Sequence, residues 1–94
     1  MKEISEIISR ILSTLKIESL NEMQESVIDA YDDRKDMVLL SPTGSGKTLA
    51  YLLPLVEHLD ASNNEVQAVV LVPSRELALQ TEQVFKSMGT NLRA

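Results

Sequence analysis

Aliphatic residues recur every three or four positions along four stretches of the chain, which is the spacing that places side chains on one face of a helix. The first stretch predicts a helix from Ile4 to Leu15, and a second helix is expected over about 22–31. A third is expected over about 48–59, and a fourth begins at Arg75. Ser74 is a suitable cap for the fourth helix and Gly89 a suitable stop.

Two short apolar runs are too continuous for one face of a helix. Residues 37–40 read Met-Val-Leu-Leu, and residues 68–72 read Ala-Val-Val-Leu-Val. Such runs are typical of strands buried on both faces of a parallel sheet. The predicted order is therefore α-α-β-α-β-α, and the expected fold class is α/β, a parallel sheet flanked by helices.

Composition and charge exclude several kinds of protein. The 94 residues form one small domain or part of one, and 14 acidic against nine basic residues give a net charge of −5. This balance argues against a broad basic surface for nucleic acid, but leaves room for a few well-placed cations. No cysteine is present, and the single His58 cannot form a multi-histidine metal site. Without a visible secretory signal or membrane span, we expect a cytoplasmic protein with no membrane partner.

The strongest chemical signal is a glycine-rich loop at 41–48, Ser-Pro-Thr-Gly-Ser-Gly-Lys-Thr, between an expected strand and an expected helix. Its glycines let backbone N–H groups turn inward around phosphate, and the helix start adds positive charge. Lys47 can reach the β- and γ-phosphates, and the Thr48 hydroxyl can bind Mg²⁺. The loop matches the second half of the P-loop pattern G-x-x-x-x-G-K-[ST], with Ser41 in place of the first glycine. An ordinary glycine-rich turn is the weaker alternative.

Three stretches together resemble the DEAD-box RNA helicases. Residues 41–55 are similar to their first motif, A-x-T-G-S-G-K-T, and residues 71–80 to motif Ia, P-T-R-E-L-A-x-Q. Residues 16–24 are similar to the Q motif, G-F-x-x-P-T-x-I-Q, in which Gln24 is intact but the glycine, aromatic and proline are replaced. The resemblance implies the N-terminal part of a RecA-like domain, with a Q-motif-like helical region at 1–36 and a P-loop to motif Ia region at 37–94.

The resemblance also implies roles for individual residues. Lys47 would be catalytic, Thr48 would bind Mg²⁺, Gln24 would hydrogen-bond adenine, and Ser74 and Arg75 would hold the RNA backbone. The residues that would bind MgATP are Gln24, Thr43, Gly44, Ser45, Gly46, Lys47 and Thr48. For Gln24, Ser74 and Arg75, a purely structural role is the alternative. Gln24 can form a capping box with Asn21, Ser74 can simply cap a helix, and Arg75 can pair with a nearby acid.

Hydrolysis needs an acidic residue for the metal and a base for the attacking water, and the family supplies both from its D-E-A-D motif. No apolar strand followed by paired acids occurs in the sequence. We therefore expect the chain alone to be inactive and to act with the remainder of a helicase chain and with RNA. Unpaired strand edges also predict self-association of the isolated chain. The alternatives are a stand-alone nucleotide-binding module, or another P-loop enzyme such as a kinase or DNA translocase.

Overall fold

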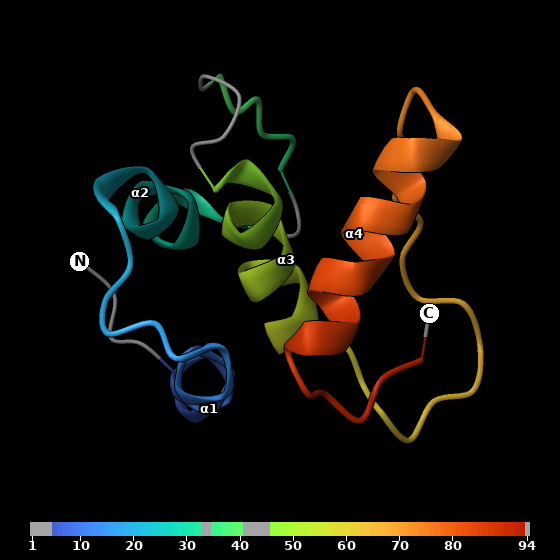
Figure 1. Cartoon of the computed structure of the whole chain (residues 1–94), viewed down its shortest axis with the longest axis horizontal. Helices are drawn as coiled ribbons and strands as arrows, with labels where there is room; N and C mark the ends of the chain where they lie inside the picture. Colours follow the sequence, from blue (N-terminus) through green and yellow to red (C-terminus); the bar gives the residue numbers. More distant parts are fainter. Residues whose placement is uncertain (1–4, 33–34, 41–45, 94) are drawn as a thin grey trace.

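A computed structural model describes residues 5–32, 35–40 and 46–93, and contains four helices in this part of the chain (Figure 1). They lie close to the four predicted helices, although Ile4, the expected first residue, falls outside the described residues. Their bounds are α1 Glu6–Leu15, α2 Glu22–Ala30, α3 Lys47–Glu57 and α4 Arg75–Ser87.

Side-chain caps fix the start of three helices. The Ser5 hydroxyl accepts a hydrogen bond from the backbone N–H of Ile8, 3.2 Å away, at the start of α1. Ser74 caps α4 in the same way, and Asn21 caps α2. Each cap satisfies a backbone N–H that has no partner within its own helix. Gly89, the predicted stop after α4, has a positive φ of 69° that suits glycine.

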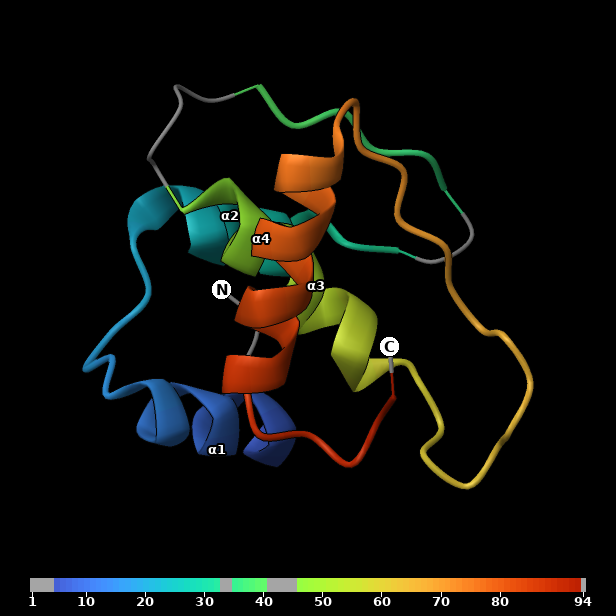
Figure 2. The same cartoon turned by 45° about the vertical axis from the view of Figure 1, so that its right-hand side comes forward.

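Helix α3 lies at the centre of the packing, between α2 and α4, with α1 across one end (Figures 1 and 2). Aliphatic side chains occur on most sides of α3, so the helix can bury apolar surface against all three neighbouring helices. Burying one such side chain contributes about 1.5–3 kcal/mol at most. The buried core residues that form one cluster are Ile8, Ile11, Leu12, Leu20, Ile28, Leu49, Leu52, Leu53, Val56 and Met88.

The prediction of two strands is not confirmed in the described part of the chain. Residues 37–40 and 68–72 contain no strand, and no backbone hydrogen bond between described residues joins either segment to a neighbour. A strand needs a partner about 4.8 Å away to satisfy its backbone groups, and the described residues supply none. Val38, Leu40, Val69 and Leu71 are consequently exposed instead of buried. The order observed in the described residues is four helices, and the expected α-α-β-α-β-α order with its parallel sheet is not confirmed there.

None of the four helices is long and apolar enough to cross a membrane, within the residues that the structure describes.

We predict that Leu53→Ala lowers the free energy of unfolding by about 2–5 kcal/mol, because Leu53 is 0% exposed at the centre of the core. Leu79→Ala is the matched control, since Leu79 is 51% exposed on α4 and its truncation is expected to cost less than about 0.5 kcal/mol. Urea unfolding followed by circular dichroism measures both. Equal losses in the two variants would contradict the assignment of the core.

Candidate nucleotide site

The described end of the glycine-rich loop is a left-handed turn that starts α3. Gly46 is the N-cap residue, with φ 88° and ψ 25°, a conformation that residues with a side chain rarely adopt. Lys47 and Thr48 follow as the first two residues of α3, and both are half-buried. Thr43, Gly44 and Ser45, which the sequence also assigns to phosphate binding, lie outside the described residues.

The start of α3 is suited to an anion. No side chain of the described residues caps it, and its first turn contains no acidic residue. The described side chains therefore leave its first backbone N–H groups open, and the helix dipole places about half a positive charge there. The Lys47 ammonium adds a full charge at the same end. These features together fit a phosphate group.

Gln24 is a buried polar residue that forms a capping box at the start of α2. The Asn21 side-chain oxygen accepts from the Gln24 backbone N–H at 2.8 Å, and the Asn21 backbone N–H donates to Gln24 Oε1 at 3.0 Å. The capping-box interpretation of these two residues is confirmed. Because Gln24 is only 7% exposed, its amide needs such partners.

Gln24 also links α2 to the glycine-rich loop. Its Nε2 donates a hydrogen bond to the Gly46 carbonyl oxygen at 3.3 Å, across 22 residues of sequence. A side-chain amide offers two N–H groups and two acceptor lone pairs, so one of each is left after these contacts. Gln24 can thus hold the loop and still have the capacity to meet a purine edge. Adenine contact by Gln24 stays a prediction.

The same contact explains why residue 46 is glycine. A Cβ placed on Gly46 would lie 2.6 Å from Gln24 Nε2, well inside normal contact distance. Substitution would therefore strain the backbone and also push the Gln24 amide away from the loop. The sequence identified both residues as binding candidates, but nothing in it indicated that they touch.

The two candidate RNA contacts lie at the start of α4. The Ser74 hydroxyl accepts from the backbone N–H of Leu77 at 3.2 Å, so its capping role is confirmed. Arg75 is exposed, and no ion pair with another described residue is recorded for it. The starts of α3 and α4 point toward the same side of the molecule, upward in Figures 1 and 2. Phosphate and RNA candidates therefore share one side of the helical layer.

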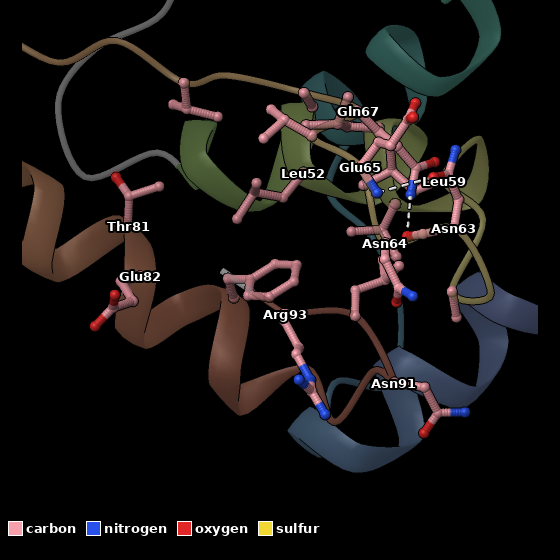
Figure 3. Close-up of a pocket in the computed structure, with 18 of the residues that line it drawn as sticks. Leu52, Leu59, Asn63, Asn64, Glu65, Gln67, Thr81, Glu82, Asn91 and Arg93 are labelled. Carbon is pink, nitrogen blue, oxygen red and sulfur yellow. Dashed lines mark hydrogen bonds between the residues drawn. The ribbon is translucent and has the colours of Figure 1, made fainter.

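A groove that the sequence did not predict lies elsewhere, between α3, α4 and residues 61–72 (Figure 3). Its volume is about 850 Å³, and it is lined by aliphatic side chains such as Leu52 and by polar side chains such as Asn63 and Arg93. None of the predicted nucleotide or RNA residues lines it. The groove is therefore separate from the candidate nucleotide site.

Comparison with known proteins gives the family. The family model described as DEAD/DEAH box helicase matches residues 21–94. The chain is 44% identical over 71 residues to DEAD-box ATP-dependent RNA helicase 8 of Arabidopsis thaliana, covering 76% of this chain and 14% of that protein. It is 41% identical over 87 residues to ATP-dependent RNA helicase DbpA of Bacillus subtilis, covering 93% of this chain and 18% of that protein. No solved structure gives a significant match.

The family match covers most of the chain, and the chain belongs to the DEAD/DEAH box helicases. Membership implies a RecA-like fold for the domain to which these residues contribute. The chain spans less than a fifth of the length of the two relatives named above.

We predict that Gly46→Ala destabilises the fold by about 1–3 kcal/mol, because Ala must adopt a positive φ and its Cβ meets Gln24. In a Gln24→Ala background the steric part disappears and only the backbone strain is left, so Gly46→Ala should cost less there. Urea unfolding of wild type, both single variants and the double variant measures this coupling. Strictly additive losses would show that the two residues do not interact.

Proposed function

We propose that this chain is the ATP-binding portion of an ATP-dependent RNA helicase. The observation that carries the proposal is the start of α3, where Gly46 in a left-handed turn leads directly into Lys47 and Thr48 and no side chain among the described residues caps the helix. This is the arrangement that a nucleotide triphosphate needs: free backbone donors, a helix dipole and a cation at one point. The names of the relatives, which describe ATP-dependent RNA helicases, support the same reading.

Each residue of the site has a separate task in this proposal. The backbone N–H groups of the loop and of the α3 start bind phosphate oxygens, and Lys47 neutralises the charge on the β- and γ-phosphates. The Thr48 hydroxyl is a hard oxygen ligand of the kind that Mg²⁺ accepts, and its place in the first turn of α3 fits that role. Bound Mg²⁺ would supply charge neutralisation between the phosphates. Gln24 would position the loop through Gly46 and contact adenine with its remaining groups.

RNA is the proposed partner of the complete protein. Arg75 is exposed at the start of α4, and its planar guanidinium suits phosphate oxygens of an RNA backbone. Ser74 can contribute its hydroxyl proton to the same phosphate while its oxygen caps α4. In a longer helicase chain, ATP hydrolysis would be coupled to RNA remodelling.

The isolated chain is proposed to bind MgATP without turnover, since the sequence offers no acidic pair behind an apolar strand. It is also proposed to associate with itself, because residues 37–40 and 68–72 expose apolar side chains without a strand partner among the described residues.

We predict that Lys47→Ala weakens MgATP binding by about 10- to 100-fold, because a charge-assisted phosphate contact is worth about 1.5–3 kcal/mol. Lys86→Ala is the control. Lys86 lies on α4 in an exposed pair with Glu82, so this substitution removes the same charge from a different helix. Isothermal titration calorimetry measures both affinities. Equal affinity of Lys47→Ala and Lys86→Ala would remove the phosphate assignment.

Adenine contact by Gln24 is tested by selectivity instead of affinity. Gln24→Ala removes the hydrogen bond to the Gly46 carbonyl and loosens the loop, which should weaken the binding of ATP and of GTP to a similar extent. A direct purine contact would in addition lower the ratio of ATP to GTP affinity, by roughly three- to tenfold for one lost hydrogen bond. Competition titrations with the two nucleotides measure this ratio. If the ratio is unchanged, Gln24 acts only through the capping box and the loop.

A further inference from the structure

Helices α2 and α3 touch each other near both of their ends. At their starts, Gln24 Nε2 donates a hydrogen bond to the carbonyl oxygen of Gly46, the N-cap of α3. At their ends, the ring of Tyr31, the C-cap of α2, lies against the ring of His58, the C-cap of α3. The ring centroids are 4.8 Å apart and the ring planes are tilted by 46°. This separation and tilt are typical of a favourable contact between aromatic rings.

The His58 ring is held in place by its own helix. Its Nδ1 lies 2.7 Å from the carbonyl oxygen of Pro54. A carbonyl oxygen can only accept, so Nδ1 carries the hydrogen and donates it. The Pro54 carbonyl is one of the last four of α3, which have no continuing helix to satisfy them, and the imidazole supplies a donor. Because this hydrogen bond already fixes the ring, the contact with Tyr31 costs little further side-chain entropy.

Two contacts at opposite ends can fix the register of α2 on α3. Ile28 of α2 and Leu53 of α3 belong to the same apolar core, whose attraction is not directional. Apolar packing alone therefore allows one helix to pivot or slide slightly on the other. Helix α3 contains 11 residues, so its ends lie roughly 16 Å apart. A second contact at this distance from the first removes most of that freedom.

We propose that His58 is a positioning residue for the nucleotide site, acting through Tyr31 and Gln24. By holding the end of α2 on the end of α3, His58 keeps the start of α2 where the Gln24 amide meets the Gly46 carbonyl. Gly46 leads directly into Lys47, so the contact that His58 maintains sets the position of the proposed phosphate-binding turn. The effect on MgATP rests on the proposed function, whereas the effect on the contact between Gln24 and Gly46 does not.

Two substitutions separate the two contacts of His58, which is exposed, so that its replacement is expected to leave the fold intact. His58→Asn keeps a side-chain N–H that can reach the Pro54 carbonyl but has no ring, whereas His58→Phe keeps a ring for Tyr31 but has no donor. Leu59→Ala is the matched control, since Leu59 lies equally far along the chain from the loop and lines the separate groove. Circular dichroism verifies the helices of each variant.

The amide resonances of Gly46 and Lys47 in the ¹⁵N-labelled chain report the Gln24 contact without nucleotide. Gln24→Ala gives the positions of these resonances when the hydrogen bond is lost. His58→Asn should move both resonances toward those positions, while His58→Phe and Leu59→Ala should leave them close to wild type. Wild-type positions in His58→Asn, which would mean that His58 only caps α3, or an equal displacement in His58→Phe would overturn the proposal.

Titration of MgATP then tests whether the register of α2 on α3 matters for binding. His58→Asn should weaken MgATP binding about two- to fivefold, in line with the loss of one aromatic contact. It should have no further effect in a Gln24→Ala background, because it acts through Gln24. Equal losses in both backgrounds would contradict this route. If the wild-type chain bound no MgATP, the proposed function would fail, while the amide resonances would still decide the role of His58.

Discussion

The burial of the aliphatic faces of α3 is the interaction on which the rest of the structure depends. The helix touches α1, α2 and α4, and Leu53 at its centre is fully buried. The same helix carries Lys47 and Thr48 in its first turn, so the packing that stabilises the fold also fixes the direction of the end that we propose binds phosphate. Core and site are therefore two parts of one helix, and a change in packing is expected to alter both stability and nucleotide affinity.

The contact between Gln24 and Gly46 connects this helix to α2. Gln24 is held by Asn21 at the start of α2 and donates to the loop carbonyl that precedes α3. Through this hydrogen bond, the region that resembles the Q motif contacts the end of the glycine-rich loop. Gln24 therefore has a positioning role that is distinct from the proposed recognition of adenine. The same role explains why a buried glutamine lies against Gly46.

Local features could be predicted from the sequence, whereas contacts between distant residues could not. The four helices, the Ser74 cap and the capping box of Asn21 and Gln24 depend on neighbours close in sequence, and all are observed. The Gln24–Gly46 contact joins residues 22 positions apart, so no local pattern revealed it. The strand prediction at 68–72 is not confirmed, because a strand also requires a hydrogen-bonded neighbour and the described residues supply none.

The most direct test of the account is to titrate MgATP into the ¹⁵N-labelled chain and follow its backbone amide resonances. The account predicts large shifts at Gly46, Lys47 and Thr48, with smaller shifts at Gln24 because it touches the loop. Amides of residues that line the separate groove, such as Arg93, should remain unchanged. Shifts that concentrate around the groove, or no saturable shifts at the start of α3, would contradict the assignment of the nucleotide site.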